Sequence, residues 1–409
     1  MMIRRRINDN RQVNSEPEYE KEKLDAPLIK SRPLNWKLLP VIALLWIVLV
    51  HVFERTVPAS VISKCSWDNW EGWKFPESSH RIVLIADPQI VDDYSYPKQS
   101  RILNFFIKRL ADNYLHRNYE LVNSILDQNT TIFLGDLFDG GRYWDDDQWL
   151  EEFNRFNRVF PKKETRLDIR SIPGNHDIGF QTIHPHVLKR FAEHHGPSND
   201  YIVLGNHSIV LFDSISLSHP DTEINSKSDA FLSNINEMIT NDYPRILLTH
   251  VPLYRFPDTQ LCGPKREKKD KPFPLQRGDQ YQTVIEYDIS KRILNTIRPS
   301  LIFAGDDHDY CDITQPYENN GLAREITAKS AAMTGGIKHP AFQLLSLNTN
   351  DNGTETFKTE ICYMPNAFHG VYAYLAFLII SSIILKNSKL ILLNVLFGLF
   401  IVDMYHRTI

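Results

Sequence analysis

Five short polar clusters contain the residue types that bind divalent metal ions and transfer protons. They are Asp87-Pro88-Gln89, Gly135-Asp136, Gly174-Asn175-His176-Asp177, Thr249-His250 and Gly305-Asp306-Asp307-His308. Each cluster follows a short apolar run, and the ligands and catalytic groups of α/β folds gather where strands end. Five clusters rich in Asp, Asn and His therefore predict a single site assembled from five loops.

The candidate metal ligands are carboxylates, amides and imidazoles. They are Asp87, Gln89, Asp136, Asn175, His250, Asp306 and His308. Two divalent ions about 3.5–4 Å apart share bridging ligands and stabilise an in-line displacement at phosphorus. Mixed oxygen and imidazole ligation suits Mn²⁺, iron or Zn²⁺, whereas a structural zinc site would use thiolates. We therefore expect a two-metal hydrolytic centre.

Elements of regular structure must bring these clusters together. Strands are expected at 81–86, 130–134, 167–172, 201–204, 208–212, 245–249, 301–304, 342–347 and 356–362, and helices at 98–126 and 146–159. Strands that alternate with helices indicate an α/β fold in which two sheets are flanked by helices and the site lies at one edge.

The composition excludes several classes of protein. The 409 residues include 46 basic and 50 acidic side chains, for a formal net charge of -4. This balance argues against a generally basic nucleic-acid-binding protein. Apolar residues make up 42% and charged residues 23%, which argues against a disordered chain.

Long apolar runs occur only near the two ends of the chain. Residues 38–53 would form a helix of about 24 Å, short of the ~30 Å hydrocarbon core, inside a transmembrane signal anchor expected at 38–57. Residues 367–385 are long enough to cross a membrane. The apolar run 390–402 is shorter, so 390–405 is a third transmembrane helix or a re-entrant one. A buried core helix is the alternative for each run.

Positive charges predict the orientation of these segments. Lysine and arginine are abundant before the first span and sparse just after it, which keeps residues 1–37 on the cytoplasmic side as a disordered tail. Residues 58–366 would then form a lumenal domain. Lys386 and Lys389 place the loop 386–389 in the cytoplasm, as the same rule requires.

Glycosylation sequons and cysteines support a lumenal domain. The sequons begin at Asn129, Asn206 and Asn352. The four cysteines, Cys65, Cys262, Cys311 and Cys362, all lie within the same domain. An oxidising lumen would allow two disulfides, and four free buried thiols are the alternative. We favour Cys65 with Cys362 because both lie beside membrane segments, but the sequence leaves all three pairings open.

The five clusters, in order and spacing over 81–347, resemble the sequence blocks of the calcineurin-like metallophosphoesterase superfamily. Two positions depart from its usual pattern: Gln89 replaces the His of Asp-x-His, and Asp306 replaces the first His of Gly-His-x-His. These departures look like the GPI-anchor ethanolamine-phosphate phosphodiesterases of the endoplasmic reticulum and Golgi. Fungal members of that subfamily carry DPQ and GDDHDYC, which are matched here at 87–89 and 305–311.

The resemblance implies a four-layer αββα sandwich that removes an ethanolamine-phosphate side branch from a mannose of the GPI glycan. The substrate would be the GPI lipid or a GPI-anchored protein, the enzyme a multi-pass protein of the endoplasmic reticulum or Golgi membrane, and the metal Mn²⁺. Other lumenal phosphoesters are alternative substrates. A non-catalytic scaffold or sorting partner for GPI-anchored cargo is the rival from another class.

The same resemblance suggests a role for each site residue. Asp136 would bridge the ions, Asp87 and His308 would complete one, and Asn175, His250 and Asp306 the other. Gln89 would be a weak ligand or a group just outside the ligand shell. His176 would protonate the leaving oxygen or stabilise phosphoryl charge, oriented by Asp177. Asp139 could orient a ligand or cap a helix, and the basic run 266–271 could meet phosphates or remain a solvated loop.

Overall fold

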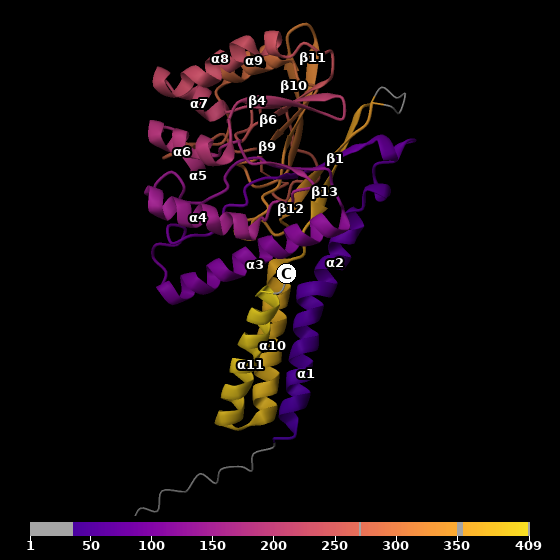
Figure 1. The fold of residues 1–409 in the computed structure, drawn as a ribbon, viewed down its shortest axis with the longest axis vertical. Coiled ribbons are helices and arrows are strands. Elements are labelled where there is room, and N and C mark those ends of the chain that lie inside the picture. Colours follow the sequence, from indigo (N-terminus) through magenta and orange to yellow (C-terminus); the bar gives the residue numbers. More distant parts are fainter. Residues whose placement is uncertain (1–35, 270, 350–354, 408–409) are drawn as a thin grey trace, which may run out of the picture.

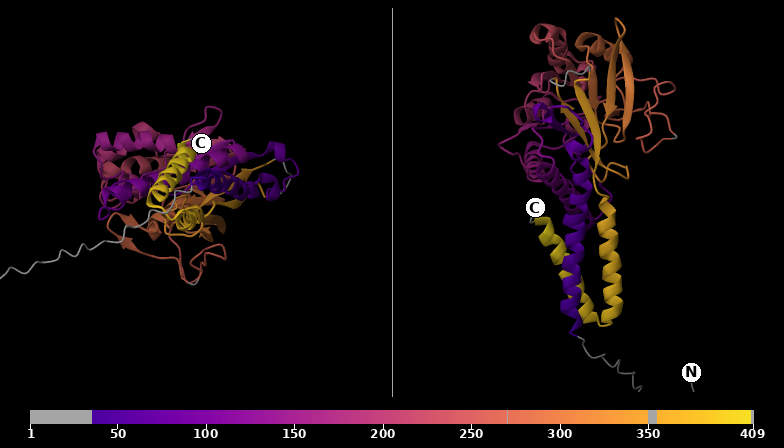
Figure 2. Two further views of the ribbon diagram at one scale, coloured as in Figure 1. Left: turned by 90° about the horizontal axis from the view of Figure 1, so that it is seen from below. Right: turned by 90° about the vertical axis from the view of Figure 1, so that its right-hand side faces the viewer.

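A computed structural model describes residues 36–269, 271–349 and 355–407. Figure 1 shows an α/β domain standing on a bundle of three long helices, and the second view in Figure 2 shows the same arrangement from the side. The prediction for residues 1–37 lies almost entirely outside the described residues, and so does the sequon at Asn352.

The domain contains two mixed β-sheets and a small hairpin. The first sheet has the order β13-β12-β1-β2-β3, with β1 His80–Ile85, β2 Thr130–Phe133, β3 Leu167–Ile169, β12 Ala341–Leu347 and β13 Phe357–Tyr363. The second has the order β10-β11-β9-β6-β5-β4, with β4 Asp200–Leu204, β5 His207–Leu211, β6 Arg245–Leu248, β9 Leu301–Ala304, β10 Cys311–Tyr317 and β11 Gly321–Thr327. The hairpin pairs β7 Arg277–Gly278 with β8 Tyr281–Gln282.

Helices and short helical turns complete the domain. They are α3 Arg101–Ile125, α4 Asp146–Val159, α5 Asn175–Ile178, α6 Pro185–His195, α7 Ser214–Ser218, α8 Thr222–Met238 and α9 Tyr287–Ile297, with 3₁₀ turns at Trp67–Asn69 and Pro76–Ser78.

Alternating side chains make each central strand apolar on both faces. In β1, Ile82 and Leu84 belong to a core cluster that also contains Ile246 and Phe303 of the second sheet, so this cluster lies between the sheets. Val83 and Ile85 belong to a second cluster shared with the helices. Because successive residues of a strand point to opposite faces, these two clusters require helices on the outer faces. The predicted sandwich of two sheets flanked by helices is confirmed.

Three helices are long and apolar enough to cross a membrane. The first runs without interruption over Leu38–Cys65, through α1 Leu38–His51, a π-helical turn Val52–Thr56, α2 Val57–Ile62 and a 3₁₀ turn Ser63–Cys65. It is therefore longer than the predicted span 38–57. The others are α10 Ala367–Leu385 and α11 Ser388–Arg407. At 20 residues, α11 would be about 30 Å long, so it exceeds the short run seen in the sequence.

Polar side chains connect these helices in the middle of the bundle. The indole Nε1 of Trp46 donates to Asn394 Oδ1 at 2.8 Å, and Asn394 Nδ2 donates to Ser381 Oγ at 2.8 Å. Gly398 lets α11 approach the Trp46 ring, because a Cβ there would lie 2.9 Å from it. Small residues and interhelical hydrogen bonds of this kind stabilise helix packing in membranes.

A buried ion pair fastens the bundle to the catalytic domain. Glu54, in the π-helical turn, pairs with Arg117 of α3, and both side chains are 7% exposed. Tyr374 of α10 donates a hydrogen bond to Glu54 at 2.7 Å. One carboxylate thus joins α10 and α3 to the first apolar helix.

Both disulfides lie at structural junctions. Cys65 is bonded to Cys362, the favoured pairing, which links the end of the first apolar helix to β13 just before α10. Cys262 is bonded to Cys311, the last residue of the Gly305–Cys311 block. The sequon residues Asn129 and Asn206 are both exposed.

We predict that Glu54→Gln lowers the stability of the full-length protein, because the amide leaves Arg117 buried without a counter-charge. Breaking one side of such a pair costs about 3–5 kcal/mol. Tryptophan fluorescence during heating in detergent would measure the fall in unfolding temperature. Asp403→Asn is the control, since it breaks the exposed pair with Arg109, where about 0–1 kcal/mol is expected. Equal shifts for the two variants would contradict a special role for Glu54.

Candidate metal centre

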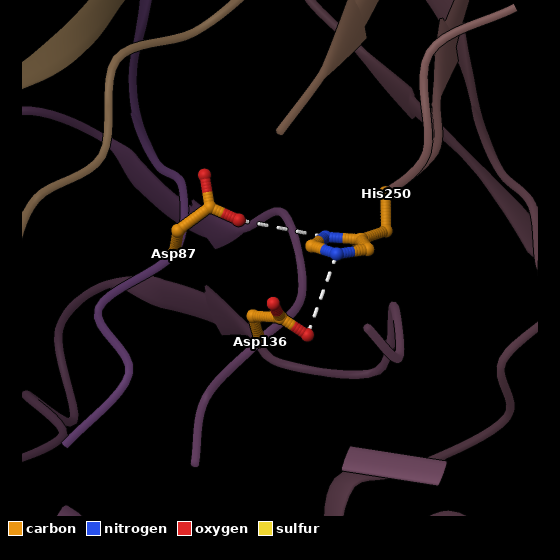
Figure 3. Close-up of side chains that lie close together, drawn as sticks. All are labelled: Asp87, Asp136 and His250. Carbon is orange, nitrogen blue, oxygen red and sulfur yellow. Dashed lines mark ion pairs between the residues drawn. The ribbon is translucent and has the colours of Figure 1, made fainter. Parts of the chain in front are cut away.

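The central parallel strands of both sheets deliver acidic and imidazole side chains to one place. Asp87 follows β1 and Asp136 follows β2, which pair in parallel, while His250 follows β6 and Asp306 follows β9, also a parallel pair. Figure 3 shows Asp87, Asp136 and His250 facing one another from three separate loops, and one ligand atom of each lies within 4.8 Å of the other two. All three are buried. The predicted convergence of strand ends is therefore present.

The separations suit a shared cation. His250 Nε2 lies 3.4 Å from Asp136 Oδ1 and 3.7 Å from Asp306 Oδ1, and His250 Nδ1 lies 3.8 Å from Asp87 Oδ1. The backbone N–H of Asp306 donates to Asp87 Oδ1 at 3.0 Å. One histidine thus faces three carboxylates, which is an excess of negative charge.

Backbone strain marks the same residues. Asp87, Gln89, Asp136, Asp306 and His308 have φ values of 47°, 32°, 50°, 68° and 66°. Residues other than glycine rarely adopt this left-handed conformation, and such strain collects at functional sites. Five of the seven predicted ligands therefore occupy costly backbone conformations that aim their side chains at the site.

Buried charge gives the site a strong affinity for cations. Burial raises the pKa of Asp87, and it raises the pKa of Asp306 to about 8, with Asp136 and Asp87 adding to the effect. Burial opposes a charge on His250, but the surrounding Asp136, Asp87 and Asp306 outweigh it and raise its pKa well above the usual value. Asp87 Oδ2 is buried and, within the described residues, has no hydrogen-bond partner. These residues fit divalent metal ions, which would satisfy both the free oxygen and the excess charge.

Carbonyl oxygens fix the orientation of the two ligand imidazoles. His250 Nδ1–H donates to the carbonyl of Leu134 at 2.8 Å, and His308 Nδ1–H donates to that of Gly335 at 2.9 Å. A carbonyl can only accept, so in each neutral ring the Nε2 keeps its lone pair for a metal. Such outer contacts tune metal ligands.

The two predicted amide ligands hold different positions. Gln89 Nε2 donates to Asp136 Oδ2 at 2.9 Å, so Gln89 orients the expected bridging carboxylate. Asn175 Oδ1 lies 3.3 Å from His250 Nε2, among the ligands, and Asn175 Nδ2 donates to the carbonyl of Gln280 at 2.9 Å. Gln280, in the turn of the β7–β8 hairpin, also accepts hydrogen bonds from Phe180 and Thr182. The sequence analysis assigned no role to it.

His176 lies beside the ligands and is oriented by Asp139. The Nδ1 atom of His176 lies 2.7 Å from the carbonyl oxygen of Asp139 and 3.0 Å from Asp139 Oδ1. The backbone N–H of His176 donates to Asp136 Oδ1 at 2.8 Å. Burial would lower the pKa of His176, but Asp136 and Asp139 raise it to about 9. The imidazole therefore holds a proton and leaves Nε2–H free to donate it.

Asp177 has a different task from the one predicted. Its carboxylate accepts backbone hydrogen bonds from Leu137, Phe138 and Gly174, at 2.8–3.2 Å. It therefore joins the two loops that carry Asp136 and Asn175 and does not orient His176. Burial and the nearby Asp136 raise its pKa to about 7. The physical reason for the difference is that Asp177 lies in the first turn of α5, where its carboxylate meets loop N–H groups.

The basic run after His250 is anchored by one buried arginine and by backbone contacts, whereas the side chains of Lys268, Lys269 and Lys271 are exposed. Arg266 is buried and pairs with Asp307 at 2.5 Å. Asp309 accepts hydrogen bonds from the backbone of Glu267 and Lys268 and pairs with Lys329 at 3.0 Å. The loop is thus fastened to the block that carries Asp306 and His308.

The fold and the site define a metal-dependent phosphoester hydrolase, and the comparisons agree. The calcineurin-like phosphoesterase profile matches residues 80–310, more than half of the chain, so the chain belongs to this family. Cell division control protein 1 of Saccharomyces cerevisiae is 45% identical over 364 residues, which cover 85% of this chain and 74% of that protein. Metallophosphoesterase 1 of Mus musculus is 25% identical over 274 residues, which cover 61% of this chain and 65% of that protein.

Among solved structures, a 5′-nucleotidase precursor from Thermus thermophilus aligns with 73% of this chain and 58% of its own. The TM-score is 0.38 and the identity 12%. The family assignment rests on the profile and on the yeast relative.

We predict that Mn²⁺ raises the unfolding temperature of metal-free protein, because cations relieve the repulsion among the buried carboxylates. A ligand at 100 times its Kd stabilises by about 2.7 kcal/mol. Asp136→Asn should lose most of this shift and bind less metal by elemental analysis. Asp127→Asn is the control, since Asp127 is exposed and its positive φ suits Asn. A shift retained in Asp136→Asn would contradict this site.

Two neighbouring substitutions should distinguish the residue that orients His176 from the residue that holds the two ligand-bearing loops together. Asp139→Asn removes the charge beside His176, so we expect hydrolysis of a dialkyl phosphodiester, whose alkoxide leaving group needs a proton, to slow by about 10–100-fold with metal content unchanged. Asp177→Asn turns an amide N–H₂ toward buried backbone donors and should cost about 1–3 kcal/mol of stability. Reversed effects, with Asp177→Asn stable but slow, would restore the sequence-based assignment.

Proposed function

We propose that this chain is a two-metal phosphodiesterase that removes an ethanolamine-phosphate side branch from a mannose of the GPI glycan. The observation that carries the proposal is that Gln89 and Asp306, the two departures from the common superfamily pattern, are both integrated into the site. Gln89 orients Asp136, and Asp306 faces His250. These are the positions at which the sequence resembles the GPI-specific subfamily.

The residues of the chain have distinct tasks in this reaction. Asp87, Asp136, Asn175, His250, Asp306 and His308 would hold the ions, with Gln89 just outside. When bound, two divalent ions polarise the phosphoryl group and make water a stronger nucleophile near neutral pH. His176 donates its Nε2 proton to the departing oxygen, held in place by Asp139 through Nδ1. A site with more oxygen and fewer imidazole ligands favours Mn²⁺ over Zn²⁺.

An aromatic pair beside His176 supports a glycan substrate. Tyr94 and Tyr143 stack with ring centroids 4.7 Å apart, and both are exposed. The backbone N–H of Arg142, next to Tyr143, donates to the carbonyl of His176 at 3.0 Å. The pair therefore lies near the proton donor and offers a flat surface with polar edges, suited to a sugar ring.

The covalent and membrane features support a lumenal compartment for residues 58–366. Two disulfides favour an oxidising environment, and the exposed Asn129 and Asn206 are available to glycosylation there. We therefore place residues 58–366 in the lumen of the endoplasmic reticulum or Golgi, with the start of α1 and the turn between α10 and α11 on the cytoplasmic side. The substrate would be a GPI lipid or a GPI-anchored protein in the same membrane.

Mass analysis of GPI glycans tests this function in cells whose own copy carries Asp136→Ala. We predict an additional ethanolamine phosphate retained on one mannose, because the substitution removes the carboxylate that would bridge the two ions. Cells with Asp127→Asn should keep the normal profile. An unchanged profile in Asp136→Ala cells, together with Mn²⁺-dependent hydrolysis of bis(p-nitrophenyl) phosphate by the purified protein, would reject GPI and leave another phosphoester as the substrate.

A further inference from the structure

The first turn of α3 exposes large apolar side chains to its surroundings. Ile102 is 74% exposed and Phe105 is 61% exposed, and Leu103 and Phe106 are exposed as well. Asn104 is the buried member of this turn. A helix of a water-soluble domain normally turns its apolar face to the core, so these four residues, the apolar turn of α3, need an apolar environment outside the domain.

The apolar turn lies on the membrane side of the domain. Figure 1 shows α3 along the bottom of the domain, above the three apolar helices, and the contacts agree. Arg109 of α3 pairs with Asp403 of α11 at 2.6 Å, and Arg117 pairs with Glu54. The apolar turn precedes these contacts, so it extends sideways from the bundle at the level where α11 ends.

Positive charges flank the apolar turn and line a cavity beside it. The cavity has a volume of about 1080 Å³ and lies between α3, α4 and the end of α11. Its cationic lining residues are Arg101, Lys108, Arg109, Arg155, Arg158 and Arg407. Its two carboxylates already have partners, since Asp112 pairs with Arg155 and Asp93 with Lys108. Within the described residues, Arg101 and Arg158 have no carboxylate partner, so two guanidinium groups remain available for an anion.

We propose that the apolar turn of α3 inserts into the membrane leaflet next to the catalytic domain, and that the cavity binds the phosphate of an anionic phospholipid. An interfacial helix combines an apolar face with flanking Lys and Arg in this way. The lipid bilayer is the occupant because the apolar turn lies at the end of the domain that carries the three apolar helices, and because the basic cavity beside it complements anionic headgroups. Arg101 and Arg158 bind the headgroup while Ile102 and Phe105 contact the acyl chains.

A single-cysteine fluorophore tests insertion in the full chain. All four native cysteines form disulfides, so Phe105→Cys carries the one free thiol for labelling with NBD. In phosphatidylcholine nanodiscs, 5-doxyl phosphatidylcholine should quench this label at least twofold. Leu322→Cys is the matched control, because Leu322 is 64% exposed at the β10–β11 turn, at the opposite end of the domain (Figure 1). Equal quenching at the two positions would overturn the insertion.

The same label tests the anion site. At equal mole fraction, 5-doxyl phosphatidylserine should quench the label at position 105 more than 5-doxyl phosphatidylcholine does. Arg101→Gln with Arg158→Gln should remove this difference while quenching by phosphatidylcholine persists, and an unchanged unfolding temperature would show that the variant is folded. Equal quenching by the two lipids before these substitutions, or a difference that survives them, would overturn the headgroup site.

Discussion

Repulsion among buried carboxylates is the constraint on which the catalytic end of this molecule depends. Asp87, Asp136 and Asp306 converge on His250 in a place that water scarcely reaches, and all three do so from left-handed backbone conformations. Neither burial nor strain is favourable alone. Bound cations would offset the unfavourable free energy of both the buried charge and the backbone strain, so we expect the fold to be less stable without metal. The fold can accommodate this free-energy cost because the central parallel strands, which carry the loops at their ends, are buried and apolar on both faces.

The contacts outside the ligands explain how a set of loops stays rigid. Asp177 joins the Asp136 and Asn175 loops through backbone N–H groups, and carbonyl groups of Leu134 and Gly335 hold the two imidazoles. Apart from the local contact between Asp177 and Gly174, these contacts join residues that are 27 to 116 positions apart. The loops of the site are therefore held together, and loss of one of these hydrogen bonds is expected to displace several candidate ligands at once.

The sequence predicted the central strands and the convergence of Asp87, Asp136 and His250 at their ends, because a buried strand that ends in Asp or His is visible in a single chain. It did not predict β10 and β11, in which polar and charged residues such as Asp312, Arg324 and Glu325 interrupt the apolar runs. It gave Asp177 the task of Asp139, since neighbours in sequence say little about which carboxylate faces an imidazole. The end of the first apolar helix also differs from the prediction, because the helix continues beyond residue 57 to Cys65.

The attachment to the membrane limits what the site can reach. The first apolar helix continues to Cys65, and the disulfide to Cys362 joins it to the segment that enters α10. The buried pair of Glu54 and Arg117 adds a third connection through α3. A domain held at three points cannot swing as it would on a flexible linker, so its metal centre stays at a nearly constant height above the helices. In the proposed function, an enzyme held in this way would select a phosphodiester by its distance from the bilayer as well as by its chemistry, and this would favour one branch of a lipid-linked glycan over freely diffusing esters.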